Sequence, residues 1–403
     1  MSHRVGVYCL YGQNFFSETS NKIGGAEKQS AYCAKFLADS GVEVAFLMAD
    51  PGKSKRIKEL YPGIKAFYNL KYTVEGGVKK RKYKAGFLQR IRDKVRSAFG
   101  LKALNVTKDN LENAMKAFSI PSVSFWMAHY LSDPLNELAL FCRANKIPFL
   151  LALASDFDLD FLEISSGRDQ FGACREKKRN TLEMSNFVLV QNRWQEKVVK
   201  DNFPEKPCFY LPNPVAIPPL QKGSKNYKTL LWIGKFDENK NPKAVINLAI
   251  KLPELNFLMI ANPADKKIEN EIRTSKPANL KIIQSVPVNE MHTFYQSSSI
   301  HLSTSLKEGF PNTFLEAAAT GIPTFSLNVD PDGLMTNSIL GQHFEGNLDA
   351  MASTIRMVIA NPDLLNEMGL KARSYVEAVH DSEKVNKRWL EIVDDVLNLS
   401  CVE

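Results

Sequence analysis

The sequence lacks long apolar runs and clustered cysteines, and each absence excludes a class of protein. Its 403 residues contain no apolar stretch near the roughly 20 residues that span a bilayer. The apolar run at residues 5–10 has neither the length nor the cleavage site of a signal peptide, so we expect no secretory leader. The cysteines are scattered, with no two at metal-ligand spacing: Cys9, Cys33, Cys142, Cys174, Cys208 and Cys401. We therefore expect a reduced, cytoplasmic protein without disulfides or structural zinc.

Two nucleotide-binding signatures are also missing. The chain has no Gly-x-Gly-x-x-Gly fingerprint and no Walker lysine loop, which disfavours nicotinamide and ATP chemistry. With 44% hydrophobic and 24% charged residues, its composition is that of an ordinary globular protein. The length exceeds that of one typical core, so two domains are expected.

The net charge of +8 belongs to a single segment. Residues 79–96 hold nine basic residues and one acid, so the rest of the chain is neutral. This localisation disfavours a nucleic-acid binder, whose charge is spread over a face. Phe87, Ile91 and Val95 recur every four residues, which predicts a basic amphipathic helix suited to an anionic membrane surface. A core helix with a solvated charged face remains the alternative.

Apolar stretches alternate with helix-like stretches in two series. The first series predicts strands at residues 5–10, 42–48, 122–127, 148–154 and 187–191. The second predicts strands at residues 230–233, 255–261, 280–283, 300–303 and 324–327. Such alternation is typical of parallel sheets with helices on both faces. We expect an α/β protein with two Rossmann-like, doubly wound domains facing across a cleft, residues 1–212 and 213–384, with ligands at the carboxyl ends of the strands.

The most informative stretch is residues 308–316, which read Glu-Gly-Phe-Pro-Asn-Thr-Phe-Leu-Glu. Pro311 suits the first position of a helix, and Gly321 followed by Pro323 ends one. Glu308 then precedes a helix N-terminus, while Glu316 lies inside the helix. Backbone N–H groups at such an end attract phosphate, and carboxylates nearby suit sugar hydroxyls.

Lys235 and Lys240 follow the strand expected at residues 230–233. Two ammonium groups at a strand end can neutralise a diphosphate that gains charge as it leaves. A solvated loop is the alternative, but the paired glutamates in the same domain favour the functional interpretation. Gly24 and Gly25 follow the first strand, where the backbone either approaches a ligand or simply turns.

His129 and three aspartates follow strands of the first domain. A lone histidine is usually structural, but the position of His129 at a strand end allows contact with a sugar. Asp156, Asp158 and Asp160 have the spacing of a calcium loop, without the Gly and bidentate Glu that such a loop requires. We interpret them as solvated or facing an acceptor, and expect no metal.

These motifs together resemble those of the retaining glycosyltransferases of family 4, which have the GT-B fold of two Rossmann-like domains. The resemblance covers essentially the whole chain and is strongest at residues 308–316, which are similar to the paired-glutamate motif of that family. Residues 24–27 resemble its glycine loop, and residues 234–240 its diphosphate loop. Asn213-Pro214 matches its interdomain segment. The resemblance also implies that the C-terminal helix, residues 385–403, packs back on the first domain.

The resemblance implies roles for individual residues. Glu308 would bind hydroxyls of the donor sugar and Glu316 those of the nucleotide ribose. Lys235 and Lys240 would hold the diphosphate, and His129 would contact the sugar near the reacting carbon. The other donor-site positions would be Gly24, Gly25, Gly309, Phe310, Asn312 and Thr313. The chain departs from the family at Lys235, where arginine is usual, and lysine lacks the bidentate fork of arginine.

The predicted function is that of a retaining, metal-independent glycosyltransferase without a cofactor. It would move a sugar from a UDP- or GDP-sugar to a hydroxyl of a glycan or lipid-linked acceptor in surface polysaccharide or glycolipid synthesis. Asp156 and Asp158 are the predicted acceptor contacts, and Ser155-Asp156 stands where relatives often carry histidine. Residues 79–96 would hold the protein peripherally at the inner face of a membrane. A GT-B nucleotide-sugar epimerase and a non-catalytic sugar-nucleotide-binding protein are the alternatives.

Overall fold

The computed structural model describes residues 3–10, 16, 25–50, 56–75, 78–81, 122–169, 172–220, 228–284, 286–287 and 290–400. Gly24 and the amphipathic helix predicted from Phe87 to Val95 lie outside these residues. The start of the basic segment lies inside them. It forms the strand β5 (Val78–Arg81), not a helix.

The first domain is built on a sheet in the order β3-β4-β2-β1-β6-β7-β8-β9, with β5 paired to β4. All its pairs are parallel except β3–β4 and β4–β5. The strands are β1 (Arg4–Tyr8), β2 (Glu43–Asp50), β3 (Glu59–Tyr61), β4 (Ile64–Glu75), β6 (Phe125–His129), β7 (Phe149–Ala152), β8 (Phe187–Val190) and β9 (Cys208–Tyr210). The five strands predicted for this domain are confirmed with shifted ends, and β3, β4, β5 and β9 were not predicted.

Helices cover both faces of this sheet, because alternate strand residues are apolar on each side. The helices are α1 (Gly25–Asp39), α4 (Asp133–Ala144), α5 (Arg175–Met184) and α6 (Arg193–Asn202), with a 3₁₀ helix at Asp156–Leu162. On one face Val5 and Val7 pack with Leu37 of α1. On the other face Leu47 packs with Leu138 of α4. This is the doubly wound arrangement expected from the sequence.

The second domain has a parallel sheet in the order β12-β11-β10-β13-β14-β15. Its strands are β10 (Thr229–Lys235), β11 (Asn256–Asn262), β12 (Leu280–Ile283), β13 (Ile300–Ser303), β14 (Thr324–Ser326) and β15 (Gly341–His343). Its helices are α7 (Pro242–Lys251), α8 (Lys266–Ser275), α9 (Met291–Gln296), α10 (Asn312–Ala319), α11 (Leu348–Ile359) and α12 (Pro362–Val379), with a 3₁₀ turn at Pro331–Gly333. The five predicted strands are confirmed, and only β15 was missed.

The chain passes between the domains twice, and the two crossings are bonded to each other. His380, which is fully buried, has its ring Nδ1 2.9 Å from the carbonyl oxygen of Asn213. The N–H of Val215 donates to the carbonyl of His380 at 2.8 Å, and that of Ser382 donates to Val215 at 3.1 Å. These bonds hold the two crossings together. The first crossing contains the predicted boundary between residues 212 and 213.

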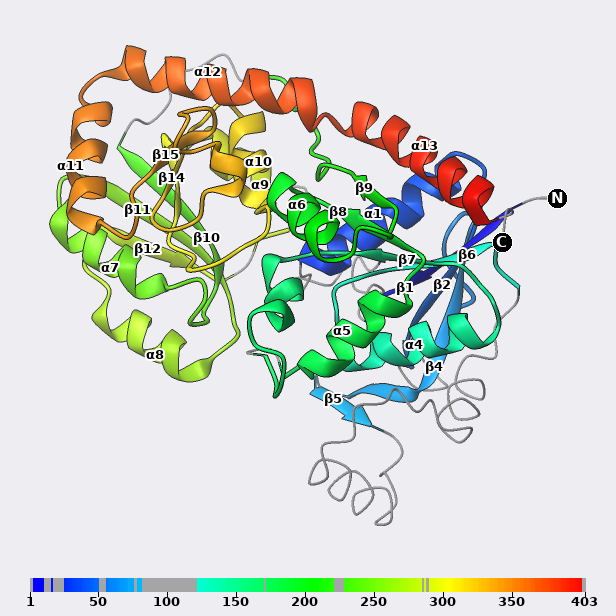
Figure 1. Ribbon diagram of the computed structural model, residues 1–403. Coiled ribbons are helices and arrows are strands. Elements are labelled where there is room, and N and C mark those ends of the chain that lie inside the picture. The colour runs from blue at the N-terminus through cyan, green and yellow to red at the C-terminus, as the bar shows by residue number, and fades with distance from the viewer. Residues whose placement is uncertain are drawn as a thin grey trace.

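The last helix, α13 (Ser382–Ser400), returns to the first domain after the second crossing. Figure 1 shows α12 running along the second domain and α13, in red, continuing over the first. Its buried residues Trp389, Ile392 and Val396 join the core that contains Val5 and Leu37. The helix begins three residues before the predicted start of the C-terminal segment at residue 385.

A second contact between the domains lies at the start of α6. Asp332 of the second domain accepts hydrogen bonds from the backbone N–H of Arg193 at 2.8 Å and of Trp194 at 3.3 Å. Its φ of 53° is in the left-handed region, which aspartate tolerates better than most residues. A carboxylate at a helix N-terminus is favourable because of the partial positive charge there. The guanidinium of Arg193 also stacks 3.8 Å from the ring of Tyr210.

The close approach of α12 to the end of α10 generates a stability prediction. A Cβ on Gly369 would lie 2.2 Å from the carbonyl oxygen of Gly321. Gly369→Ala should therefore lower the free energy of unfolding by about 1–3 kcal/mol, although alanine ordinarily favours a helix by about 1 kcal/mol. Urea unfolding followed by circular dichroism measures the change.

The control is Ser374→Ala, at an exposed position of the same helix. It should leave stability within about 0.5 kcal/mol of the wild type. A Gly369→Ala variant as stable as this control would show that α12 does not approach Gly321 so closely.

Candidate functional site

The loops that follow β10 and β13 are joined by hydrogen bonds. The backbone N–H of Leu306 donates to the carbonyl of Asn239 at 2.7 Å. The side chain of Asn239 pairs with the backbone of Lys307: its Nδ2 donates to the carbonyl at 3.0 Å, and its Oδ1 accepts from the N–H at 3.2 Å. One loop carries the predicted lysine pair and the other the paired-glutamate motif. The fold therefore brings the two motifs together.

Lys240 and Glu308 form an ion pair where these loops meet. Their Nζ and Oε1 atoms are 2.5 Å apart, and the side chains are only 27% and 20% exposed. The Nδ2 of Asn239 lies 3.4 Å from the same carboxylate oxygen. The backbone of Lys240 is also fixed, since its N–H donates to Asp237 at 2.8 Å and its carbonyl accepts from Thr304 at 2.7 Å. The ammonium group is thus held in place at the carboxyl end of β10.

Lys235 is the last residue of β10, and its side chain is exposed. Among the described residues it forms no ion pair, in contrast to Lys240. Its long side chain can therefore turn toward a ligand without breaking a contact. A lysine at this position supplies a point charge to a phosphate, not a planar fork.

Helix α10 begins at Asn312, and no side chain among the described residues caps its first N–H groups. Pro311 precedes the helix with φ −65° and ψ 124°, so the prediction that it is the first helical residue is wrong by one position. The fixed φ of proline fits either position, and only the extended ψ separates them. The helix ends as predicted, with Gly321 at a left-handed φ of 71°. The N–H groups of Asn312 and Thr313 thus mark an anion-attracting end.

Glu316 makes its contacts on both sides of the interdomain boundary. Its Oε2 accepts from the hydroxyl of Tyr295 at 2.9 Å. Its Oε1 lies 2.6 Å from Nζ of Lys28, which belongs to α1 in the first domain. Next to this pair, Nε2 of Gln29 donates to Oδ1 of Asn312 at 3.3 Å. Sequence reasoning missed Lys28 and Tyr295, and the only signal for Lys28 was its position directly after residues 24–27.

Gly25 is the first residue of α1, so the loop predicted over residues 24–27 ends sooner than expected. Glycine is tolerated at the start of a helix, and therefore a pair of glycines need not delay one. The start of α1 lies opposite the start of α10, as the contacts of Lys28 and Gln29 show. Two helix N-termini, one from each domain, meet at this place.

His129 ends β6 and is held by α1. Its Nδ1 lies 3.0 Å from the hydroxyl of Ser30, which itself donates to the carbonyl of Ala26 at 3.0 Å. Burial lowers the pKa of His129 to about 4, since the surroundings disfavour the charged imidazolium. The ring is therefore uncharged near pH 7, where it can still make hydrogen bonds.

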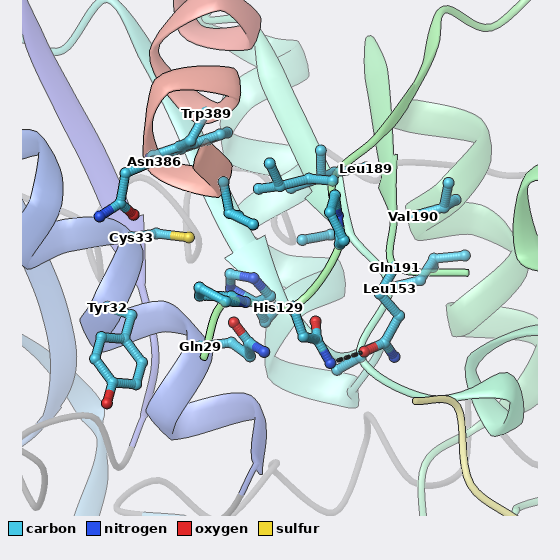
Figure 2. A pocket seen from close by; sticks show the side chains of 17 residues that line it. Gln29, Tyr32, Cys33, His129, Leu153, Leu189, Val190, Gln191, Asn386 and Trp389 are labelled. Atoms are coloured by element: carbon cyan, nitrogen blue, oxygen red, sulfur yellow. Dashed lines mark hydrogen bonds between the residues drawn. The ribbon is translucent and has the colours of Figure 1, made fainter. Parts of the chain in front are cut away.

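His129 lines a pocket at the carboxyl ends of β6, β7 and β8 (Figure 2). Helices α1 and α13 and the first interdomain crossing complete its walls. In this wall Nδ2 of Asn213 donates to Oε1 of Gln191 at 2.8 Å and to the carbonyl of Phe310 at 3.0 Å. A Cβ on Gly309 would lie 2.6 Å from Nε2 of Gln191. Gly309 and Phe310, both predicted donor-site residues, therefore lie against the first domain.

Asp158 is fully buried, not solvated. Its carboxylate accepts from the backbone N–H groups of Leu131 at 3.0 Å, Ala154 at 2.8 Å and Ser155 at 3.2 Å. Burial raises its pKa to about 6, although these N–H groups and Lys178 oppose the shift. Such contacts favour a role in fixing the loops after β6 and β7, instead of the predicted contact with an acceptor.

The other two aspartates also have partners, so of the two alternatives, solvated or facing an acceptor, the solvated one does not describe them. Asp160 pairs with Nζ of Lys178 at 2.5 Å and with Nε of Arg175 at 2.8 Å. Asp156 is half-buried and accepts from Nδ2 of Asn192 at 3.1 Å and Nε2 of Gln195 at 2.9 Å. Of the three, Asp156 is the least enclosed. Among the described residues, no group of three or more His, Cys, Asp or Glu side chains is arranged to hold a metal.

Comparison with protein families identifies the second domain. Residues 219–375 match the family model described as glycosyl transferases group 1. The C-terminal domain is that of a group 1 glycosyl transferase. The matched region contains Lys235, Lys240, Glu308 and Glu316, so it spans all four residues of the predicted donor site that can carry charge.

Solved structures extend the group 1 glycosyl transferase resemblance to the fold of the whole chain. A sucrose-phosphate synthase from Thermosynechococcus elongatus superposes with a TM-score of 0.73 at 13% identity, covering 98% of this chain and 100% of that one. The pneumococcal O-GlcNAc transferase GtfA, in complex with UDP and GlcNAc, gives 0.62 at 11% identity, covering 98% and 99%. TarM gives 0.63 at 12% identity, covering 99% of both chains. The predicted GT-B fold is confirmed.

Curated relatives match over part of their length. A glycosyltransferase of Haemophilus influenzae, itself uncharacterised, is 27% identical over 208 residues, 49% of this chain and 56% of the relative. The UDP-N-acetylglucosamine–peptide N-acetylglucosaminyltransferase GtfA subunit of Streptococcus pneumoniae is 26% identical over 233 residues, 53% of this chain and 46% of the relative. The alignments thus span about half the length of these relatives. Among the described residues, no helix is long and apolar enough to cross a membrane.

The burial of His129 generates a prediction about protonation. The imidazole should stay neutral from pH 8 to about pH 5, because its folded-state pKa is about 4 compared with the ordinary value of 6.5. Between about pH 6.5 and about pH 4 the unfolded chain binds a proton on this ring that the folded protein does not. The stability that the neutral ring contributes is therefore lost as the pH falls from about 6.5 to about 4.

Histidine-ring NMR tests this prediction, with the resonance of His129 assigned by its loss in His129→Asn. The native protein should show no titration of that ring near pH 6.5, whereas the urea-denatured chain should titrate there. A native midpoint at or above about pH 6 would contradict the burial of this side chain.

Proposed function

We propose that the chain is a retaining glycosyltransferase that moves a sugar from a UDP- or GDP-sugar to a hydroxyl of a glycan or lipid-linked acceptor. The observation that carries the proposal is that Lys240 is paired with Glu308 in the loops before α10, while Glu316 inside α10 makes its ion pair across the domain boundary. Lys240 lies 2.5 Å from Glu308, and both stand beside the open end of α10. This combination suits a ligand with phosphates at one end and hydroxyls at the other.

The donor would lie with its diphosphate against the second domain. Lys235 and Lys240 supply positive charge, and the N–H groups of Asn312 and Thr313 supply donors without a charge of their own. Glu308 is then positioned to accept hydrogen bonds from hydroxyls of the sugar, beside the ammonium of Lys240. Support comes from the GtfA structure of the same fold, which contains UDP and GlcNAc.

Catalysis in this arrangement depends on position and charge. The bond between the anomeric carbon and the phosphate oxygen breaks, and the acceptor oxygen bonds to that carbon on the same face. The proton of the acceptor hydroxyl goes to the leaving phosphate, so no side chain needs to act as a base. Lys240 stabilises the charge that develops on the phosphate, because its ammonium is already held in place. Neutral His129 would contribute a hydrogen bond to the sugar.

The acceptor would enter from the first domain. Asp156 remains a proposed acceptor contact, since it is only half-buried and follows β7 at the carboxyl end of the sheet. We also propose that the enzyme acts in surface polysaccharide or glycolipid synthesis. Residues 79–96 would then contact an anionic membrane. The donor mechanism described above requires no metal ion.

The donor is identified by thermal stabilisation with UDP-, GDP- and ADP-sugars. A rise in melting temperature with one of them, followed by transfer to an added acceptor with retention at the anomeric carbon, is the expected result. Conversion of the donor alone into another sugar isomer would instead indicate an epimerase. Binding without turnover across acceptors would indicate a sugar-nucleotide-binding protein.

Glu308→Gln tests the role of the first glutamate. The variant keeps the shape of the side chain but loses its charge, so turnover should fall about a hundredfold or more while donor binding persists. Product formation from the identified donor measures the effect.

Glu271→Gln is the matched control, because Glu271 forms a surface ion pair with Lys243 at 2.7 Å in the same domain. It should retain wild-type turnover. A Glu308→Gln variant that transfers sugar as fast as this control would remove Glu308 from the mechanism.

A further inference from the structure

Helices α1 and α10 start opposite each other, and each is tied to the other by side chains of its first turns. Lys28 reaches Glu316, and Gln29 reaches Asn312. These contacts join residues 288 and 283 positions apart in the chain. The position between the two helix N-termini is therefore built equally by both domains, although the roles proposed so far assign cations from the second domain alone.

Lys28 is held in its charged form at this boundary. Its side chain is 22% exposed and that of Glu316 is 25% exposed. Burial, the largest single influence, lowers the pKa of Lys28, but Glu316 and Tyr32 together outweigh it, and the pKa is raised. The ring of Tyr32 lies 5.9 Å from the ammonium and adds a weaker attraction. A permanent cation therefore stands beside the carboxylate proposed to bind the ribose.

The occupancy of Glu316 limits how a ribose can bind. Tyr295 donates to Oε2, and Lys28 pairs with Oε1. A ribose hydroxyl that binds Oε1 shares or takes over the oxygen that Lys28 now occupies. An ammonium has three donors on a flexible stem, so it can turn to a new acceptor close by. In a nucleoside diphosphate that acceptor is present, since the phosphates are attached to the same ribose.

We propose that Lys28 is a positioning residue for the donor: it is paired with Glu316 before the nucleotide binds, and transfers to the diphosphate when the ribose takes its place. This inference rests on the proposed use of a nucleoside-diphosphate donor. The phosphates then lie between Lys28 of the first domain and Lys240 of the second. Donor binding thereby aligns the two domains, because one ligand carries the contacts of both.

Isothermal titration with UDP, or with whichever of UDP, GDP and ADP the wild type binds, tests the exchange, together with NMR titration by the corresponding nucleoside. Lys28→Met should weaken diphosphate binding about tenfold or more, as expected for the loss of one charge-assisted hydrogen bond. Binding of the nucleoside should be unchanged or tighter. The nucleoside has no phosphate for Lys28 to bind, and in the variant its ribose no longer competes with Lys28 for Glu316. Lys28→Arg should restore most of the diphosphate affinity.

Lys35→Met is the matched control, since Lys35 lies on the same helix with its ammonium 5.0 Å from the ring of Tyr61, away from Glu316. It should bind both ligands as the wild type does. Diphosphate binding by Lys28→Met that equals or exceeds the wild type would overturn the inference and leave Lys28 as a competitor of the nucleotide. Equal losses for nucleoside and diphosphate would also overturn it, in favour of a structural role. A wild type that binds none of the three diphosphates would instead contradict the proposed function itself.

Discussion

The site depends on the placement of α10, whose N-terminus points at the boundary between two separately folded sheets. Several contacts hold it there. Asn213 in the first interdomain crossing donates to the carbonyl of Phe310, directly before the helix. The carbonyl of Gly321, after the helix, lies so close to α12 that there is no room for a side chain at Gly369. These contacts fix the position of α10, which carries Glu316 and follows Glu308.

The orientation of the two domains is held by contacts at the crossings and at the start of α6. The crossings are joined at Asn213 and His380, where the chain passes from one domain to the other. Away from the crossings, the carboxylate of Asp332 binds the N–H of Arg193 at the start of α6. Between these places lies the ion pair of Lys28 with Glu316, the contact that a bound nucleotide would have to change. The domains are therefore held together by the contacts of His380 and Asp332, and the Lys28–Glu316 pair lies between them.

The sequence predicted the donor half of the site better than the first domain, for physical reasons. Lys240 and Glu308 follow neighbouring parallel strands, so strand order alone brings their loops together. The contact of Lys28 with Glu316 depends on how the two domains are oriented, and no local pattern encodes that orientation. The interactions of Asp158 were missed because its role was judged from its position after a strand, whereas its carboxylate accepts from backbone N–H groups of its own loop and of the loop at Leu131.

The strands of the first domain show a similar division. Those in the centre of the sheet are continuous apolar runs, which is why β1, β6, β7 and β8 were predicted. Strand β4 mixes apolar and polar residues along its 12 residues, as strands nearer a sheet edge do, and was missed. The missed strands β3, β4 and β5 lie on the side of the sheet away from β6, β7 and β8, whereas the missed strand β9 leads into residues 211–214, which line the pocket.

The central claim is that a nucleoside-diphosphate sugar binds between α1 and α10, in contact with both domains. A crystal structure of the chain with the bound nucleoside diphosphate tests it most directly. The account predicts phosphates within hydrogen-bond distance of Lys240 and of the first N–H groups of α10, with the ribose on Glu316. A nucleotide bound elsewhere, for instance in the pocket beneath α13 with Glu316 still paired to Lys28, would contradict it.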